Sequence, residues 1–152
     1  MVKLGWAVTI YIFVSFFLFL MTSFTSLGWI VYGLIILPIY AAILLVWWLM
    51  VWQNPTKGVR IRYWIWSIVL VLQVSTILAS PGNCYGWTQG ANCYSNLQIF
   101  LGDVPRSGSS NIPHWKPLEN NFPVLALAYG VSLVVALSFI IIKKTDSTTT
   151  ST

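Results

Sequence analysis

Residues 27–52, LGWIVYGLIILPIYAAILLVWWLMVW, are the longest of four apolar runs that decide the fold of this chain. The other runs cover residues 4–22, 63–80 and 122–142, and none of the four contains Asp, Glu, Lys, Arg or His. A bilayer core of about 30 Å is crossed by about 20 apolar residues in a helix, and each run meets or approaches that length. The sequence therefore predicts four transmembrane helices.

The composition of the chain points the same way. Apolar residues make up 57% of the 152 residues and charged residues only 7%, against about 25% charged residues in soluble domains. We expect one membrane domain over residues 1–144 and a disordered cytoplasmic tail, rich in Ser and Thr, over residues 145–152. The first apolar run is longer than the core of a signal peptide, so a retained span is favoured over a cleaved signal.

The basic residues predict the orientation of the chain in the membrane. Only Arg106 and Lys116 fall on one side if four spans alternate. The other six fall on the opposite side: Lys3, Lys57, Arg60, Arg62, Lys143 and Lys144. The positive-inside rule then places both termini in the cytoplasm and residues 81–121 on the oxidising, non-cytoplasmic side. The net charge of +5 follows this bias, and no basic stripe suggests binding of nucleic acid.

Most tryptophans come out near the cytoplasmic interface in this topology. An indole ring there can bury its apolar body and keep its N–H hydrated. A chlorophyll, quinone or sterol site would also use such rings, but an interfacial belt is the favoured interpretation. The belt consists of Trp6, Trp47, Trp48, Trp52, Trp64 and Trp66.

A few positions within the runs predict contacts between helices. Pro38 lies near the centre of the second run with Gly33 before it, which predicts a kink that serves helix packing or shapes a cavity. Gln73 is the only amide deep in a run, so it should face another helix, as a packing residue rather than a ligand group. The fourth run has two stripes of small residues that let another backbone approach. They are Ala128, Ser132 and Ala136, and on a neighbouring stripe Ala126 and Gly130.

The segment 81–121 holds the two cysteines of the chain, Cys84 and Cys93. An oxidising compartment favours a disulfide between them. A metal pair is the weaker alternative, because His114 is the one further nitrogen ligand and zinc sites usually need three or four ligands. Residues 83–85 and 92–94 both read Asn-Cys-Tyr, which suggests a small hairpin around the bridge.

The same segment is the expected place for recognition by a partner. It is far longer than ordinary connections, and loops of this length are either functional or unstructured. Trp87 and the sequence His114-Trp115-Lys116 are interpreted as an outer-loop interface on the protein surface. Contact with a phosphate or a quinone head group is the alternative role for His114.

No catalytic constellation is found in the sequence. Nucleophile–base sets, glycine-rich phosphate loops and Cys-x-x-Cys redox pairs are all missing from the sequence, and we expect no enzyme activity. The layout is similar to that of tetraspan membrane proteins, but claudin-like members carry their cysteines between the first two spans, where this chain has only a few residues. The fold expected is an all-α integral membrane protein: a four-transmembrane-helix bundle with one long disulfide-stapled outer loop between the third and fourth helices.

Three functions are compatible with these features. The leading hypothesis is a non-catalytic accessory subunit of a larger integral membrane complex, such as an oxidase, monooxygenase or photosynthetic assembly, with other membrane subunits and lipids as partners. The first alternative is a self-associating tetraspan that organises membrane or cell contacts through its outer loop. The second is a lipid- or quinone-handling protein that uses the Pro38 kink and His114. No cofactor is expected to be bound by this chain alone, while lipid or quinone contact is an open alternative.

Overall fold

The computed structural model describes residues 2–54, 58–84, 93–102, 104–106, 108 and 111–143. Helices dominate this part of the chain, as predicted. The elements, in chain order, are α1 (Val2–Thr22), α2 (Ser26–Val31), the π-helical turn η1 (Tyr32–Ile36), α3 (Leu37–Gln53), β1 (Gly58–Arg60), α4 (Tyr63–Ala79), β2 (Pro81–Asn83), β3 (Tyr94–Ser95), α5 (Asn96–Phe100), α6 (Lys116–Asn120), α7 (Phe122–Ser138) and β4 (Ile141–Lys143).

Four long helical rods form the body of the molecule. Two of them are long and apolar enough to cross a membrane by length and composition: α1 and the continuous helix Ser26–Gln53, whose mean hydropathies over 18 residues are 2.2 and 2.6. The other two, α4 and α7, are also apolar and have 17 residues each.

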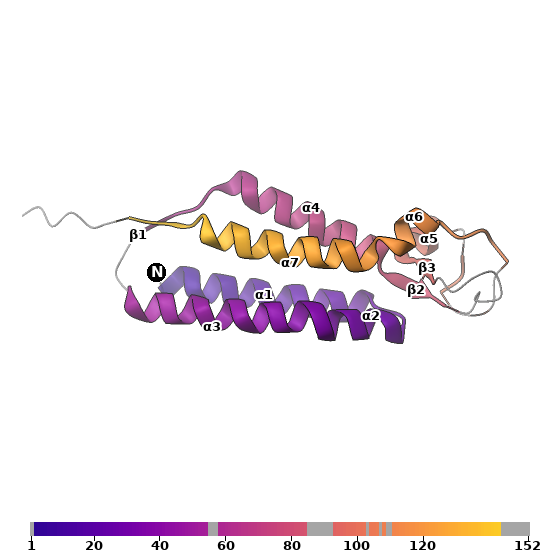
Figure 1. The fold of residues 1–152 in the computed structure, drawn as a ribbon, viewed down its shortest axis with the longest axis horizontal. Helices are drawn as coiled ribbons and strands as arrows, with labels where there is room; N and C mark the ends of the chain where they lie inside the picture. Colours follow the sequence, from indigo (N-terminus) through magenta and orange to yellow (C-terminus); the bar gives the residue numbers. More distant parts are fainter. Residues whose placement is uncertain are drawn as a thin grey trace, which may run out of the picture.

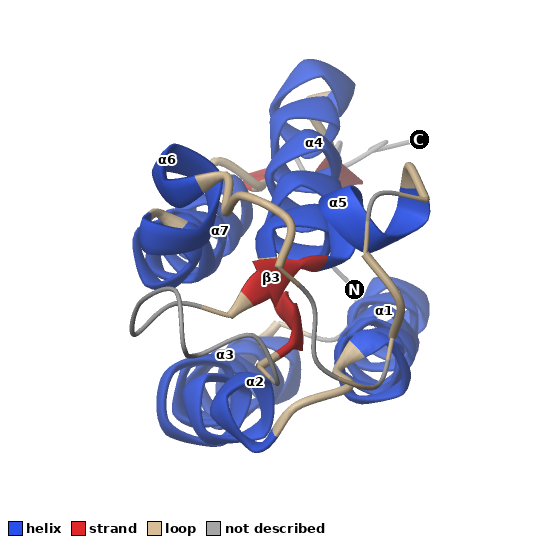
Figure 2. Cartoon of the chain, turned by 90° about the vertical axis from the view of Figure 1, so that its right-hand side faces the viewer, coloured by secondary structure: helices blue, strands red, loops and turns tan. Residues whose placement is uncertain are grey.

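The rods pack as two pairs (Figure 1). Helices α4 and α7 make the most extensive contact between helices, and α1 lies along α3. Viewed along the bundle, the four rods occupy the corners of a square in the order α4, α7, α3 and α1 (Figure 2). The start of α1 and the ends of α3 and α7 lie at one end of the bundle, and the short elements between α4 and α7 form a cap at the other.

The second rod changes helix type just before Pro38. The N–H of Leu37 donates to the carbonyl of Tyr32, five residues earlier, so one π-helical turn is inserted between α2 and α3. Proline has no N–H and its ring clashes with the preceding turn, so a local departure from α-helix geometry relieves both effects. Gly33, the other position that the sequence singled out, lies within this turn.

Short β-ribbons lie at both ends of the bundle. The ribbon in the cap is the hairpin suggested by the Asn-Cys-Tyr repeat, whereas the ribbon at the other end departs from the expected all-α fold. At one end β1 pairs with β4 in antiparallel register, with Val59 opposite Ile142. The fourth apolar run was expected to stay helical to residue 142, but α7 ends at Ser138. Three consecutive isoleucines follow Phe139, and β-branched side chains favour a strand when a neighbouring strand is there to pair with.

Candidate functional site

Five polar side chains meet in the middle of the bundle, and every rod contributes to the group. Tyr11 and Ser15 come from α1, Tyr40 from α3, Gln73 from α4 and Tyr129 from α7. Four of the five side chains belong to fully buried residues, and Tyr11 is partly buried. Each residue lies close to the middle of its rod, so the group forms one layer across the bundle. We call these five residues the central polar layer.

Hydrogen bonds connect the central polar layer without a gap. The Tyr11 hydroxyl donates to Gln73 Oε1 at 2.9 Å, and Gln73 Nε2 donates to Ser15 Oγ at 2.8 Å. The hydroxyls of Ser15, Tyr40 and Tyr129 form a triangle with sides of 2.6, 2.6 and 3.0 Å. A further contact of 3.1 Å joins the Tyr11 and Tyr129 hydroxyls. All four rods are therefore tied together at one level.

The supply of protons limits how these contacts can be satisfied. The four hydroxyls carry one proton each, and Gln73 offers one N–H toward Ser15, so five protons serve six short contacts. When the Tyr11 hydroxyl donates to Gln73, the three hydroxyls of the triangle can donate to one another around the ring in either direction. Alternatively, the Tyr129 hydroxyl donates to Tyr11. The group consists of hydroxyls and one amide, which supply hydrogen bonds and no charge.

Aromatic rings support the central polar layer from both sides. The Tyr11 ring packs edge-on against Trp66, with centroids 5.7 Å apart, and Phe19 packs against Tyr129 at 5.4 Å. Tyr40 also meets Phe16 at 6.2 Å. These edge-to-face contacts fix the ring orientations that the hydrogen bonds require.

The small residues of α7 divide between buried and half-buried positions. Ala126, Gly130 and Ala136 are buried, whereas Ala128 and Ser132 are half-buried. A Cβ atom placed on Gly130 would lie 2.5 Å from Cδ1 of Ile39, so this glycine permits a close approach of α3. The hydroxyl of Ser132 donates to the carbonyl of Tyr129 in its own helix.

The cap contains the predicted disulfide and hairpin, and both predictions are confirmed. Strands β2 and β3 pair in antiparallel fashion, and Cys84 is bonded to Cys93. Asn96 anchors the cap because its Nδ2 donates to the carbonyls of Thr22 and Ile77, at 2.9 and 3.0 Å. The cap is thus fastened to the ends of α1 and α4.

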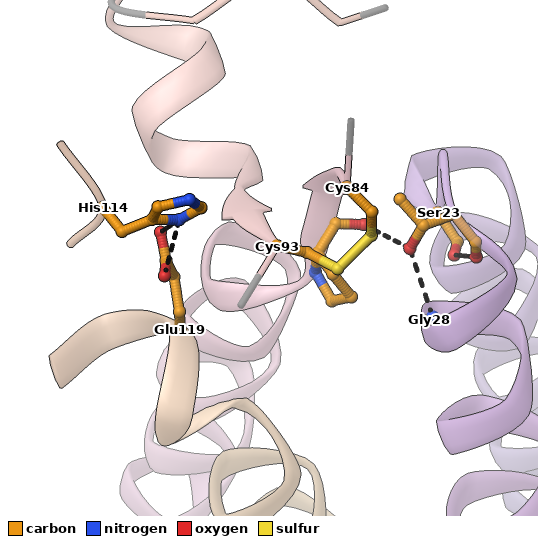
Figure 3. The surroundings of a disulfide bond; sticks show 8 residues. Ser23, Gly28, Cys84, Cys93, His114 and Glu119 are labelled. Carbon is orange, nitrogen blue, oxygen red and sulfur yellow. Dashed lines mark hydrogen bonds and ion pairs between the residues drawn. A yellow bond between two sulfur atoms is a disulfide. The ribbon is translucent and has the colours of Figure 1, made fainter. Parts of the chain in front are cut away.

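His114 does not lie on the surface, which corrects the sequence-based expectation. Its side chain is only 3% exposed, and its Nδ1 lies 3.1 Å from the Glu119 carboxylate, itself only 2% exposed. The imidazole stacks on Tyr94 with centroids 3.9 Å apart. In Figure 3, the disulfide lies between the His114–Glu119 pair and Ser23. His114 is therefore an internal residue of the cap.

The remaining residues of the expected outer-loop interface have different surroundings. Trp115 and Lys116 are exposed, and Trp115 retains 37% of its accessible surface. Trp87 lies outside the described residues. A surface for a partner would therefore include Trp115 and Lys116 without His114.

We expect Glu119→Gln to destabilise the cap by about 1 kcal/mol, because a neutral acceptor replaces the charged acceptor of the His114 hydrogen bond. Amide hydrogen exchange of residues 93–100 measures the effect. Asn120→Ala, one residue along the same helix and exposed, is the matched control. Equal exchange rates in the two variants would show that the His114–Glu119 pair does not stabilise the cap.

No metal site can be assigned to the described part of the chain. Within it, no group of three or more His, Cys, Asp or Glu residues is placed to hold a metal ion.

Comparisons with protein-family models, with curated proteins and with solved structures give no match for this chain. Its function must therefore be argued from its own geometry.

Sequence reasoning identified one member of the central polar layer, Gln73, and missed the other four. Tyrosine was counted with the apolar residues, so hydroxyls at positions 11, 40 and 129 drew no attention. A usable signal was present, because each of the four apolar runs has a tyrosine or glutamine near its centre. Polar groups at equal depth in all spans predict a shared hydrogen-bonded layer.

Proposed function

We propose that the chain is a non-catalytic accessory subunit of a larger integral membrane complex, which it enters as a four-span bundle with a disulfide-bridged outer cap. The observation that carries the proposal is the distribution of polar and apolar side chains. Uncharged polar groups lie inside the bundle, and large apolar side chains cover its outside.

The outward-facing apolar residues occur on every rod. Their exposed fractions are 66% for Phe13, 73% for Leu34, 65% for Val71 and 61% for Val124, while Gln73 at the centre is 6% exposed. A water-soluble monomer rarely exposes contiguous apolar patches above a few hundred Å². Lipid chains or neighbouring transmembrane helices are the surroundings that suit such a surface.

The dimensions of the rods support four crossings. At 1.5 Å per residue, the 17 residues of α4 and of α7 extend about 26 Å each, close to the hydrocarbon thickness of about 30 Å. Helix α7 runs beside the helix Ser26–Gln53, α4 runs beside α7, and all four rods contribute to the central polar layer. If the longer rods cross the bilayer, α4 and α7 lie at the same depth and cross it too.

The distribution of charge supports the proposed orientation. Lys3 and Arg62 lie at the end of the bundle where α1 and α4 begin, and Arg106 and Lys116 belong to the cap. The six-to-two excess of basic residues favours the first end as cytoplasmic. The cap, with its disulfide, is then on the oxidising side.

The character of the interior supports a bracing role. The central polar layer holds the four helices in register through neutral hydrogen bonds, and Gly130 allows close packing of α7 on α3. A rigid apolar exterior can then pack against catalytic neighbours or fill lipid gaps between them. On the cap, Phe100 and Leu101 are 80% and 57% exposed, so an apolar surface is also available outside the membrane.

That cap surface favours the self-associating tetraspan as a second candidate. Exposed Phe100, Leu101 and Trp115 could meet the cap of another copy. The two candidates differ in what they bind, because an accessory subunit contacts different chains and a self-associating tetraspan contacts copies of itself.

Mild detergent extraction of native membranes, followed by native electrophoresis and mass spectrometry of the band, tests the proposal. We expect the chain in a band much larger than its own 17.1 kDa plus detergent, together with other integral membrane proteins. A strongly dissociating detergent serves as the control and should release the chain from that band. Migration as a lone monomer or a homo-oligomer in the mild detergent would overturn the accessory-subunit proposal.

A further inference from the structure

An apolar groove opens between α3 and α7 in the half of the bundle away from the cap. Its volume is about 470 Å³, within the range of ligand sites, about 300–1,000 Å³. The groove is lined by Ile39, Ala42 and Met50 on one side and by Val134, Leu137 and Ile140 on the other, among others. Both helices run in the same direction through the bundle, so the groove follows their length toward the end where β1 and β4 lie (Figure 1).

The length of the groove along the helices corresponds to the thickness of one leaflet of a bilayer. From Ile39 to Met50, a rise of 1.5 Å per residue gives about 17 Å, and half of a 30 Å core is about 15 Å. Toward the cap the α3 lining of the groove begins at Ile39, whose side chain lies against Gly130. The central polar layer lies at the same level. A partner helix that crosses the whole membrane would therefore fit only half of its length into this groove.

A basic residue, Arg62, lies near the end of the groove away from the cap. Arg62 lies over the ring of Phe139 at 5.7 Å, and the two sequence neighbours of Phe139, Ser138 and Ile140, line the groove. No acidic residue occurs between residues 1 and 102 of the sequence. Basic groups next to a span attract anionic lipid head groups.

From this combination we infer that the groove binds an acyl chain of an anionic phospholipid of the inner leaflet, with the phosphate held at the basic end near Arg62. An apolar lining, a length of about one leaflet, an end at the level of the central polar layer and a positive charge near the other end are the properties that suit such a lipid. The inference rests on the proposed membrane orientation. It goes beyond the accessory role by naming a bound lipid.

Native mass spectrometry of the purified full chain tests this site. Phosphatidylglycerol and phosphatidylcholine with identical acyl chains are added at equal concentration. We expect wild type to retain phosphatidylglycerol preferentially. Ala42→Phe, which fills the groove, should reduce this adduct several-fold, whereas Ala41→Phe, exposed on the same helix and outside the groove lining, should not.

A second pair of variants separates recognition of the lipid head group from binding of the acyl chain. Arg62→Gln should lower the ratio of phosphatidylglycerol to phosphatidylcholine adducts, and Arg106→Gln on the cap should leave it unchanged. If Ala42→Phe fails to fold, a series of phosphatidylglycerols of increasing chain length replaces it, with retention expected to rise until the chain fills the groove.

Several results would overturn the inference. Equal retention of the two lipids by wild type, equal effects of the two alanine variants, or retention independent of chain length would each exclude the site. A homodimer mass lost only in Ala42→Phe would mean that a second copy occupies the groove. Because the purified chain is used, failure here is distinct from failure to find a larger complex in native membranes.

Discussion

Tyr129→Ala is expected to lower the free energy of unfolding by about 3–5 kcal/mol, the cost of truncating a large buried ring. The Tyr129 side chain is 0% exposed and lies within hydrogen-bond distance of Tyr11, Ser15 and Tyr40. Removing it opens a cavity at the centre of the bundle and breaks the triangle of hydroxyls. Reversible unfolding in mixed detergent micelles measures the change.

Two further variants separate packing from hydrogen bonding at this position. Tyr129→Phe keeps the ring and removes the hydroxyl, so we expect a loss of only about 1–2 kcal/mol. Tyr63→Ala, at an 80% exposed tyrosine, should change stability by no more than about 0.5 kcal/mol. If Tyr129→Ala were no more harmful than Tyr63→Ala, the central polar layer would have no stabilising role.

Replacing both cysteines by serine is expected to destabilise the cap by about 2–3 kcal/mol, the chain-entropy value for so short a loop. Strands β2 and β3 are brief, and the bond between Cys84 and Cys93 closes the connection between them. We expect faster amide exchange in β2, β3 and α5. The long helices should exchange as before, because their hydrogen bonds and packing do not involve the sulfurs.

The long helices serve as the internal reference for this experiment. A rise in exchange restricted to the cap would support a local role for the disulfide. Unchanged exchange in the cap would show that Asn96 and its bonds to Thr22 and Ile77 hold the cap without the bridge. Reduction of wild type under native conditions should reproduce the double-serine result.

The helices were predictable because their physical cause is local. Each apolar run is bounded by polar, glycine or proline residues, and the starts of α4 and α7 coincide with the predicted starts of their runs. The ribbon β1–β4 was not predictable from hydropathy, because Ile140 continues an apolar run whether it is helical or extended. Pairing with a segment about 80 residues away in the sequence determined that the end of this run is extended.

The disulfide was predictable because two cysteines permit one intramolecular pairing. The position of His114 was not, because its burial depends on two partners that sequence spacing does not connect. Glu119 follows it by five residues in α6, whereas His114 lies in the irregular segment before that helix, and Tyr94 precedes it by twenty. A histidine in a turn-rich segment resembles a surface residue until the fold places a carboxylate beside it.

The proposed four-span topology is the claim on which the accessory role, the outer cap and the lipid groove all depend. It can be tested with single introduced cysteines at Lys3, Arg62, Lys116 and Lys143, probed in sealed vesicles with a membrane-impermeant maleimide. The two native cysteines are bonded to each other and give no background while oxidised.

In the four-span topology, we expect Lys116→Cys to be labelled from the non-cytoplasmic side alone and Lys3→Cys, Arg62→Cys and Lys143→Cys to be labelled from the cytoplasmic side alone. Opposite sides for positions 62 and 116 would establish that α4 crosses, and opposite sides for 116 and 143 that α7 crosses. Labelling of all four positions from the same side would rule out the four-span topology, because only α1 and the helix Ser26–Gln53 would then span the membrane.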